Sequence, residues 1–301
     1  MSNESHHSYM NTPFQVLEAN IQTQIKRSKM GTLKLVLLGV LAGFFIGGGA
    51  AASAVVMHTI DNVGIARFIG GIVFTIGLMM ITFIGGELFT GCCLMILGVV
   101  HRKVRVVSLL RVLALVFFSN MIGAMLATLI VFYSGQYDYS GGLLGAYVIK
   151  IALSKSTIPF GTAFCSGIMC NVFVCGAVIM ASTAREAGGK IWAMFFPIMV
   201  FVVSGFEHCV ANMSYIPAGI LAKSDAKYAT IAMEQYGITA EQLAQISWKA
   251  FFVDNLIPVT IGNIVGGMGL GIVLYLAYEK LPKLRTKYRK FYACFFQINI
   301  I

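Results

Sequence analysis

The stretch G-F-E-H-C-V-A-N-M, residues 205–213, places a carboxylate and an imidazole side by side in an apolar part of the sequence. Residues 191–206 before them carry only uncharged side chains. A carboxylate inside a membrane-spanning helix costs roughly 2.5–3.5 kcal/mol on insertion scales. Such a cost is tolerated where the group meets a partner, free backbone amides or a water-filled path. The stretch therefore predicts a break in a membrane helix, a functional group within one, or both.

The composition of the chain favours a lipid environment. Of its 301 residues, 58% are hydrophobic and only 11% are charged, whereas a soluble domain carries about 25% charged residues. Runs of about 20 apolar residues span a bilayer as helices. We therefore expect an all-α integral membrane protein with six transmembrane helices. The expected spans are Leu35–Met57, Phe68–Gly98, Val112–Gln136, Gly161–Thr183, Ile191–Ala222 and Asn255–Tyr278.

The two halves of the sequence share motifs in the same order. The second run contains G-G-E-L-F-T-G (85–91) and the fifth contains G-F-E-H-C-V-A-N (205–212), which share Gly-x-Glu. The third run contains F-S-N-M-I-G-A-M (118–125) and the sixth contains I-G-N-I-V-G-G-M (261–268), which share Asn, Gly and Met. Three spans per half make the repeats inverted across the membrane, with interrupted second and fifth helices, as in transport proteins. Chance similarity among glycine-rich helices is the alternative interpretation.

The 22 lysines and arginines predict the orientation. Most flank the first run, follow the second and fourth runs, or lie at the C-terminal end, which the positive-inside rule assigns to the cytoplasm. We expect a cytoplasmic amphipathic helix in residues 1–30, a channel domain in 31–280 with repeats at about 31–137 and 155–280, and a basic cytoplasmic tail in 281–301. The expected location is the plasma or inner membrane. Topology then explains the net charge of +10, and nucleic-acid binding is disfavoured.

Two glutamates and one histidine lie inside the apolar runs. Glu87 and Glu207 stand beside glycines, where a helix can open, and a carboxylate is a strong acceptor for the amides so freed. We interpret both as supports of helix breaks, with direct contact with a permeant as the alternative. His208 has no counterpart, since Leu88 follows Glu87. Imidazole donates, accepts and titrates near neutrality, so His208 is expected to serve a permeant, with ordinary packing as the alternative.

Four motifs resemble the formate/nitrite transporter family, with the strongest similarity to its formate channels. The similarity covers roughly residues 30 to 280, and it implies an aquaporin-like fold assembled as a homopentamer, with one pore per protomer in the lipid bilayer. The family conducts small monovalent anions or their acids, such as formate, nitrite, hydrosulfide, acetate and lactate. Passive or proton-linked passage of formate is the expectation here. The motifs are G-E-L-F-T-G (86–91), C-N-V-F-V-C-G-A-V (170–178), G-F-E-H-C-V-A-N-M-S-Y-I-P-A-G-I (205–220) and D-N-L-I-P-V-T-I-G-N-I-V-G-G (254–267).

The resemblance also implies roles for single residues. Thr90 and His208 would face each other near the pore centre, and Asn171 would lie close to His208. Lys155 would line a vestibule and draw anions in. Apolar constrictions are implied at Phe74, Leu78, Phe89, Val174 and Phe201.

Two other classes of protein compete with this interpretation. A neutral-solute channel of the water or glycerol type is disfavoured because Asn-Pro-Ala occurs nowhere in the sequence. A membrane enzyme could use Cys92, Cys93 and His208 as a metal or thiol site, but the cysteine spacing lacks a metal-binding pattern. The sequence thus predicts no catalytic residue, no metal site and no cofactor.

Overall fold

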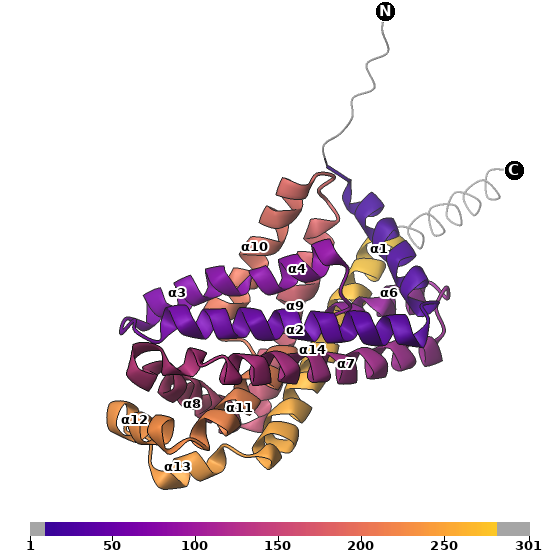
Figure 1. Ribbon diagram of the computed structural model, residues 1–301. Helices are drawn as coiled ribbons and strands as arrows, with labels where there is room; N and C mark the ends of the chain where they lie inside the picture. Colours follow the sequence, from indigo (N-terminus) through magenta and orange to yellow (C-terminus); the bar gives the residue numbers. More distant parts are fainter. Residues whose placement is uncertain (1–9, 282–301) are drawn as a thin grey trace, which may run out of the picture.

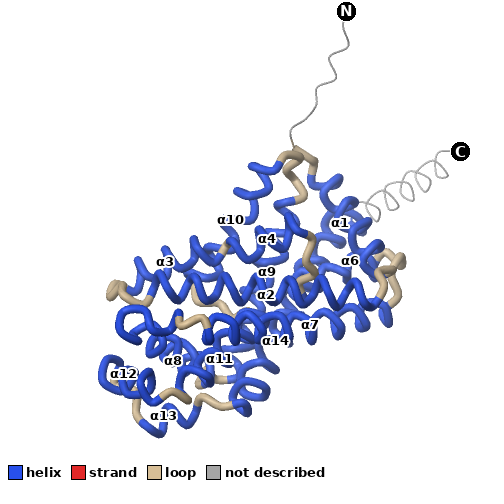
Figure 2. The backbone as a smooth tube through the Cα atoms, in the orientation of Figure 1, coloured by secondary structure: helices blue, strands red, loops and turns tan. Residues whose placement is uncertain are grey.

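The computed structural model describes residues 10–281, so the basic tail expected over 281–301 lies outside the described residues except for its first position. Helices and loops make up this part of the chain (Figure 2), and one isolated β-bridge joins Met10 to Ala184. Five of the described helices are long and apolar enough to cross a membrane, which makes the chain a multi-pass membrane protein. They are Thr32–Met57, Val63–Ile84, Val106–Tyr133, Phe160–Ala181 and Ala250–Lys280.

The second and fifth expected spans are each divided into two parts. In the second, α3 (Val63–Phe74) and α4 (Ile76–Ile84) precede a break, after which α5 (Phe89–Cys92) leads through a 3₁₀ turn at Cys93–Met95 to α6 (Ile96–Val100). In the fifth, a break separates α10 (Ala187–Val203) from α11 (Cys209–Lys223). At 17 residues, α10 falls short of the about 20 needed to span a bilayer alone.

Two pairs of helices cross closely at glycines in equivalent places. Helix α2 (Thr32–Met57) lies along α7 (Val106–Tyr133) (Figure 1), and α9 (Phe160–Ala181) packs on α14 (Ile257–Tyr275). A Cβ on Gly123 of α7 would lie 1.9 Å from the Val40 carbonyl oxygen of α2, and one on Gly266 of α14 would lie 2.2 Å from that of Ile168 of α9. Larger residues would push these backbones apart. The matched glycines of the two sequence halves therefore make matched crossings.

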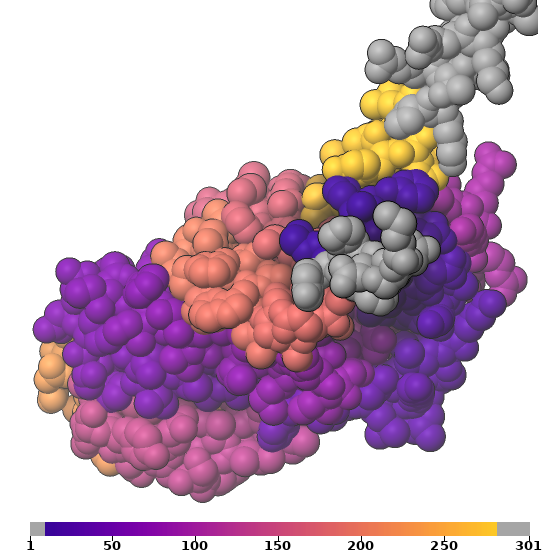
Figure 3. All heavy atoms as spheres, turned by 90° about the horizontal axis from the view of Figure 1, so that it is seen from above, coloured from indigo at the N-terminus to yellow at the C-terminus, as the bar shows by residue number. Residues whose placement is uncertain are grey.

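The first helix packs on the protein itself. Helix α1 (Pro13–Ser28) contacts α6, α7 and α9, and its Ile21 is fully buried while Phe14 is 57% exposed. The Nδ2 of Asn20 donates to the Ser182 hydroxyl at 3.0 Å, in the segment between α9 and α10. Seen from above, the indigo atoms of α1 lie beside the salmon atoms of that segment (Figure 3). The helix is thus tied to the segment that leads into the fifth span.

Short helices cover the end of the molecule far from α1 (Figure 1). There Asp138 accepts hydrogen bonds from Lys227 Nζ (2.5 Å) and Tyr228 Oη (3.1 Å). These two donors lower the pKa of Asp138 below its ordinary value of 3.8. The elements of this end are a 3₁₀ segment at Gln136–Gly142, α8 (Leu143–Ser156), α12 (Ala226–Tyr236) and α13 (Ala240–Gln245). Two π-helical segments, Ala250–Leu256 and Leu276–Lys280, flank α14.

Candidate functional site: a buried polar centre between two helix breaks

Both helix breaks turn at a left-handed glycine. Gly85 (φ +102°) ends α4 and Gly205 (φ +72°) follows α10. A residue with a Cβ is strained at such φ values, so glycine is the residue that allows the chain to leave the helix here. Each break runs through a glutamate and restarts a helix at the fourth residue after the glycine, Phe89 in one case and Cys209 in the other. The interruptions therefore coincide with the two Gly-x-Glu motifs.

Two buried asparagines satisfy the backbone groups that the breaks set free. Asn120 Oδ1 accepts from the Phe89 amide at 2.8 Å, and its Nδ2 donates to the Glu87 carbonyl at 2.9 Å. Asn263 repeats this arrangement, accepting from the Cys209 amide at 2.9 Å and donating to the Glu207 carbonyl at 3.0 Å. A carboxamide can both accept and donate, which a carboxylate cannot. One asparagine thus closes both sides of each break.

Each glutamate forms an ion pair with a basic side chain from another helix. Arg27 Nε of α1 lies 2.5 Å from Glu87 Oε2, and Lys155 Nζ of α8 lies 2.8 Å from Glu207 Oε1. Glu207 Oε2 also accepts from Asn212 Nδ2 at 2.6 Å. We expected these carboxylates to accept from the amides of the breaks. Instead, the Phe89 and Cys209 amides donate to the asparagines, and the Glu87 and Glu207 amides donate to the Leu38 carbonyl and the Ser166 hydroxyl. Each carboxylate stays inside the protein because a cation compensates its buried charge.

The repeated motifs mark the two asparagines as equivalent positions without indicating their role. The signal was present, since Asn120 and Asn263 follow the two Gly-x-Glu motifs in the same order in each half. The motifs do not separate the asparagines from the glutamates as acceptors, because a carboxylate is also a strong acceptor for a free amide. Arg27 belongs to none of the shared motifs, so only the packing of α1 brings it to Glu87.

Thr90 and His208 meet between the two breaks, as expected. Their side chains are 3.1 Å apart, Oγ1 to Nε2, and both residues are buried. The Nδ1 of His208 accepts from the Ala211 backbone amide at 3.0 Å and so caps α11. Because an amide N–H can only donate, the proton of the neutral imidazole lies on Nε2 and is given to Thr90. The Thr90 hydroxyl then keeps its own proton, which meets no acceptor among the described residues.

Asn171 contributes to this centre through the backbone of Thr90. Its Nδ2 donates to the Thr90 carbonyl at 3.2 Å and to the Asn263 carbonyl at 2.6 Å. The resemblance implies that Asn171 lies close to His208; in the described residues its side chain bonds to Thr90, the partner of His208, and to Asn263 and Cys175. Asn171 therefore holds Thr90 in place opposite the imidazole.

The five residues expected at apolar constrictions are all buried in one core cluster. The rings of Phe74 and Phe201 meet edge to face with centroids 5.7 Å apart. Phe201 also stacks on His208, with centroids 5.9 Å apart and planes inclined by 26°. An apolar layer thus covers the polar centre on this side. Leu78, Phe89 and Val174 belong to the same cluster.

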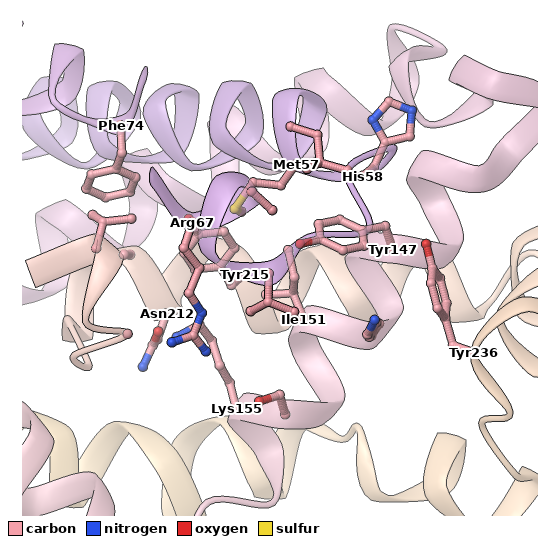
Figure 4. A pocket seen from close by; sticks show the side chains of 18 of the residues that line it. Met57, His58, Arg67, Phe74, Tyr147, Ile151, Lys155, Asn212, Tyr215 and Tyr236 are labelled. Carbon is pink, nitrogen blue, oxygen red and sulfur yellow. The ribbon is translucent and has the colours of Figure 1, made fainter. Parts of the chain in front are cut away.

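A cavity of about 620 Å³ opens beside this apolar layer. Phe74, Phe201 and His208 line its inner end, and Lys155 lines it as expected. Figure 4 shows side chains from several helices projecting into the cavity, with Phe74 at one side of the view and Tyr236 at the other. The cavity therefore reaches from His58 and Tyr236 to the Phe74–Phe201 layer and to His208, one member of the polar centre.

The polar centre does not resemble a metal site. Within residues 10–281, no group of three or more His, Cys, Asp and Glu side chains is arranged to hold a metal ion. Cys92 and Cys93, which a membrane enzyme might use, are free and fully buried. The Cys92 thiol donates to Glu87 Oε2 at 3.6 Å. The two thiols pack beside the first break and share no site with His208.

These features define a class: a multi-pass helical membrane protein whose two interrupted helices meet at a buried polar pair. The chain belongs to the formate/nitrite transporter family, whose family model matches residues 14–277. It is 37% identical to the formate channel FocA of Haemophilus influenzae over 205 residues, 68% of this chain and 71% of that protein. A solved pentameric formate channel with formate bound superposes with a TM-score of 0.72 at 35% identity, covering 82% of this chain and 97% of the other. A second solved channel of the same family gives a TM-score of 0.73 at 22% identity, covering 88% and 99%, and so shares the fold.

Proposed function

We propose that this chain is a channel for a small monovalent anion, formate first, or for its conjugate acid. The observation that carries the proposal is the buried Thr90–His208 pair beneath the Phe74–Phe201 layer, at the inner end of a cavity lined by basic residues. The relatives named formate channels support formate as the permeant. We expect transport without enzymatic turnover, as in the other channels of the family.

The proposed passage has three stages. Basic side chains raise the anion concentration in the cavity. The Phe74–Phe201 layer excludes hydrated ions, because burying a bare charge among apolar groups is expensive. The free proton of the Thr90 hydroxyl then offers a hydrogen bond that lowers this cost. In the proton-linked form of this passage a proton moves through His208, which requires Nδ1 to release the Ala211 amide.

The assembly and orientation are also part of the proposal. We propose a homopentamer with a pore in each protomer, on the precedent of the pentameric formate channel that it resembles. The distribution of Lys and Arg favours both termini in the cytoplasm. The loop between α2 and α3 and the end of α12, which line the cavity, lie at the end of the molecule far from α1 (Figure 1). On that orientation this end faces the outside of a plasma or inner membrane.

Flux through proteoliposomes tests the function. Formate, nitrite, hydrosulfide and lactate would be offered separately at external pH of about 5 and about 7 to the wild type and to His208→Ala. The matched control is His58→Ala, because His58 lines the outer part of the same cavity and bonds to Val55 and Ser140. We expect formate flux in the wild type and the control, and a large loss or an altered pH dependence in His208→Ala. A wild type that passes glycerol and none of these anions would overturn the proposal in favour of a neutral-solute channel.

A further inference from the structure

The cavity holds one guanidinium whose charge meets no acidic partner in the part of the chain that the structure describes. Arg67 extends from α3 into this space, as Figure 4 shows. Its Nη1 lies 3.2 Å from the position that a Cβ on Gly205 would occupy, so the guanidinium lies against the second helix break. The ion pairs among residues 10–281 do not include Arg67. Its charge is therefore available to a ligand in the cavity.

The other cations of the cavity are already engaged. Lys155 is paired with Glu207 at 2.8 Å, so much of its charge is compensated inside the protein. Lys150 Nζ lies 4.4 Å from the ring centroid of Tyr236 and 5.9 Å from that of Tyr147, an arrangement that favours a cation–π contact. Arg67 thus differs from both lysines, since within residues 10–281 it makes neither an ion pair nor a cation–π contact.

Arg67 also has a suitable position along the path. It precedes Phe74 by seven residues on α3, which places the two side chains on the same helix face and about 10 Å apart along the axis. An anion held at Arg67 would therefore stand in water about two helical turns before the Phe74–Phe201 layer. This is the point at which an anion must begin to lose its hydration shell.

We propose that Arg67 is the anion-binding residue of this cavity, and that it selects small anions with two oxygen atoms, such as formate or nitrite, over hydrosulfide. The inference rests on the proposed function. A guanidinium presents parallel N–H donors that match both oxygens of a carboxylate, whereas an ammonium acts as a point charge. Hydrosulfide has a single acceptor atom, so Arg67 would attract it by charge but could not form the paired hydrogen bonds. Arg67 therefore contributes both attraction and selectivity.

Two substitutions separate these contributions. Arg67→Gln removes both the positive charge and the parallel N–H donors of the guanidinium. Arg67→Lys keeps the positive charge and removes the parallel donors. Lys150→Gln is the matched control, since it removes an equal charge from the same cavity. Because Arg67 is exposed to the cavity, all three variants are expected to fold, which their elution as the wild-type oligomer would check. Formate and hydrosulfide fluxes would be measured against concentration at low and at high salt.

We expect Arg67→Gln to raise the half-saturating formate concentration roughly two- to fivefold at low salt, the size of an exposed charge contact, with little change in the maximal rate. High salt should shrink this difference by screening. Arg67→Lys should keep the salt dependence and lose the preference for formate over hydrosulfide. If Arg67→Gln and Lys150→Gln changed the half-saturating formate concentration equally, the inference would be overturned in favour of a general electrostatic attraction by all basic residues of the cavity. Formate flux in Arg67→Gln equal to that of the wild type would also overturn it. A wild type without formate flux would overturn the proposed function, and the inference with it.

Discussion

Replacing Asn263 by leucine should destabilise the protein by a predictable amount. Leucine has a similar size, so the substitution removes hydrogen bonds with little change in packing. It leaves the Cys209 amide and the Glu207 carbonyl without their partner, and both residues are buried. The Gly167 carbonyl loses the Asn263 contact too, but it lies within α9 and keeps its helical bond. At about 1–3 kcal/mol for each orphaned group, the expected loss is roughly 2–6 kcal/mol.

The assay is thermal unfolding of the purified oligomer in detergent, followed by intrinsic fluorescence and by size-exclusion chromatography. An unfolding entropy of about 2.1 cal/mol/K per residue gives roughly 1.6 °C per kcal/mol for 301 residues, so the midpoint should fall by at least about 3 °C. Asn120→Leu should cause a similar loss, because Asn120 makes the same bonds at the first break. Ser119→Ala is the control, since that hydroxyl bonds only to the Leu115 carbonyl of its own helix.

The reasoning fails if Asn263→Leu unfolds at the temperature of the wild type or of Ser119→Ala. That result would mean that the amide and carbonyl of the second break find other partners at no cost. A large loss in Asn263→Leu with none in Asn120→Leu would retain the energy estimate and refute the equivalence of the two breaks.

Three further outcomes are expected. Thr90→Val should reduce formate flux into proteoliposomes at least about tenfold, because the hydroxyl proton that faces the permeant is lost. A flux equal to that of the wild type would contradict this. Lys155→Met should destabilise the protein by roughly 3–5 kcal/mol, because it leaves Glu207 charged and unpaired. Adding Glu207→Gln should restore most of this stability, measured by thermal unfolding. A double variant less stable than Lys155→Met would refute this. Hydrogen bonds lower the pKa of Asp138, so its contribution to stability is complete above pH 3.8 and lost as the pH falls through the lowered value. After correction for the intrinsic pH dependence of exchange, amide protection in α12 should fall over that range in the wild type and stay constant in Asp138→Asn.

Much of the fold could be predicted from local sequence. The length of the apolar runs identified the long helices, because about 20 apolar residues are needed to cross the hydrocarbon core. The Gly-x-Glu motifs located both breaks, since a left-handed turn requires glycine and a buried carboxylate requires a partner. The pairing of Thr90 with His208 came from the resemblance to a known family. Periodicity and composition do not contain it.

The sequence by itself determined where the helices run and where they open, because those features depend on residues close together in the chain. Only the tertiary structure decided which groups satisfy the openings. Glu87 meets Arg27 from 60 residues away, and Glu207 meets Lys155 from 52 residues away. The same packing turned Nδ1 of His208 toward the Ala211 amide and left Arg67 free in the cavity. A side chain's partner in a membrane interior depends on which helices lie against it, and that is settled only when the helices assemble.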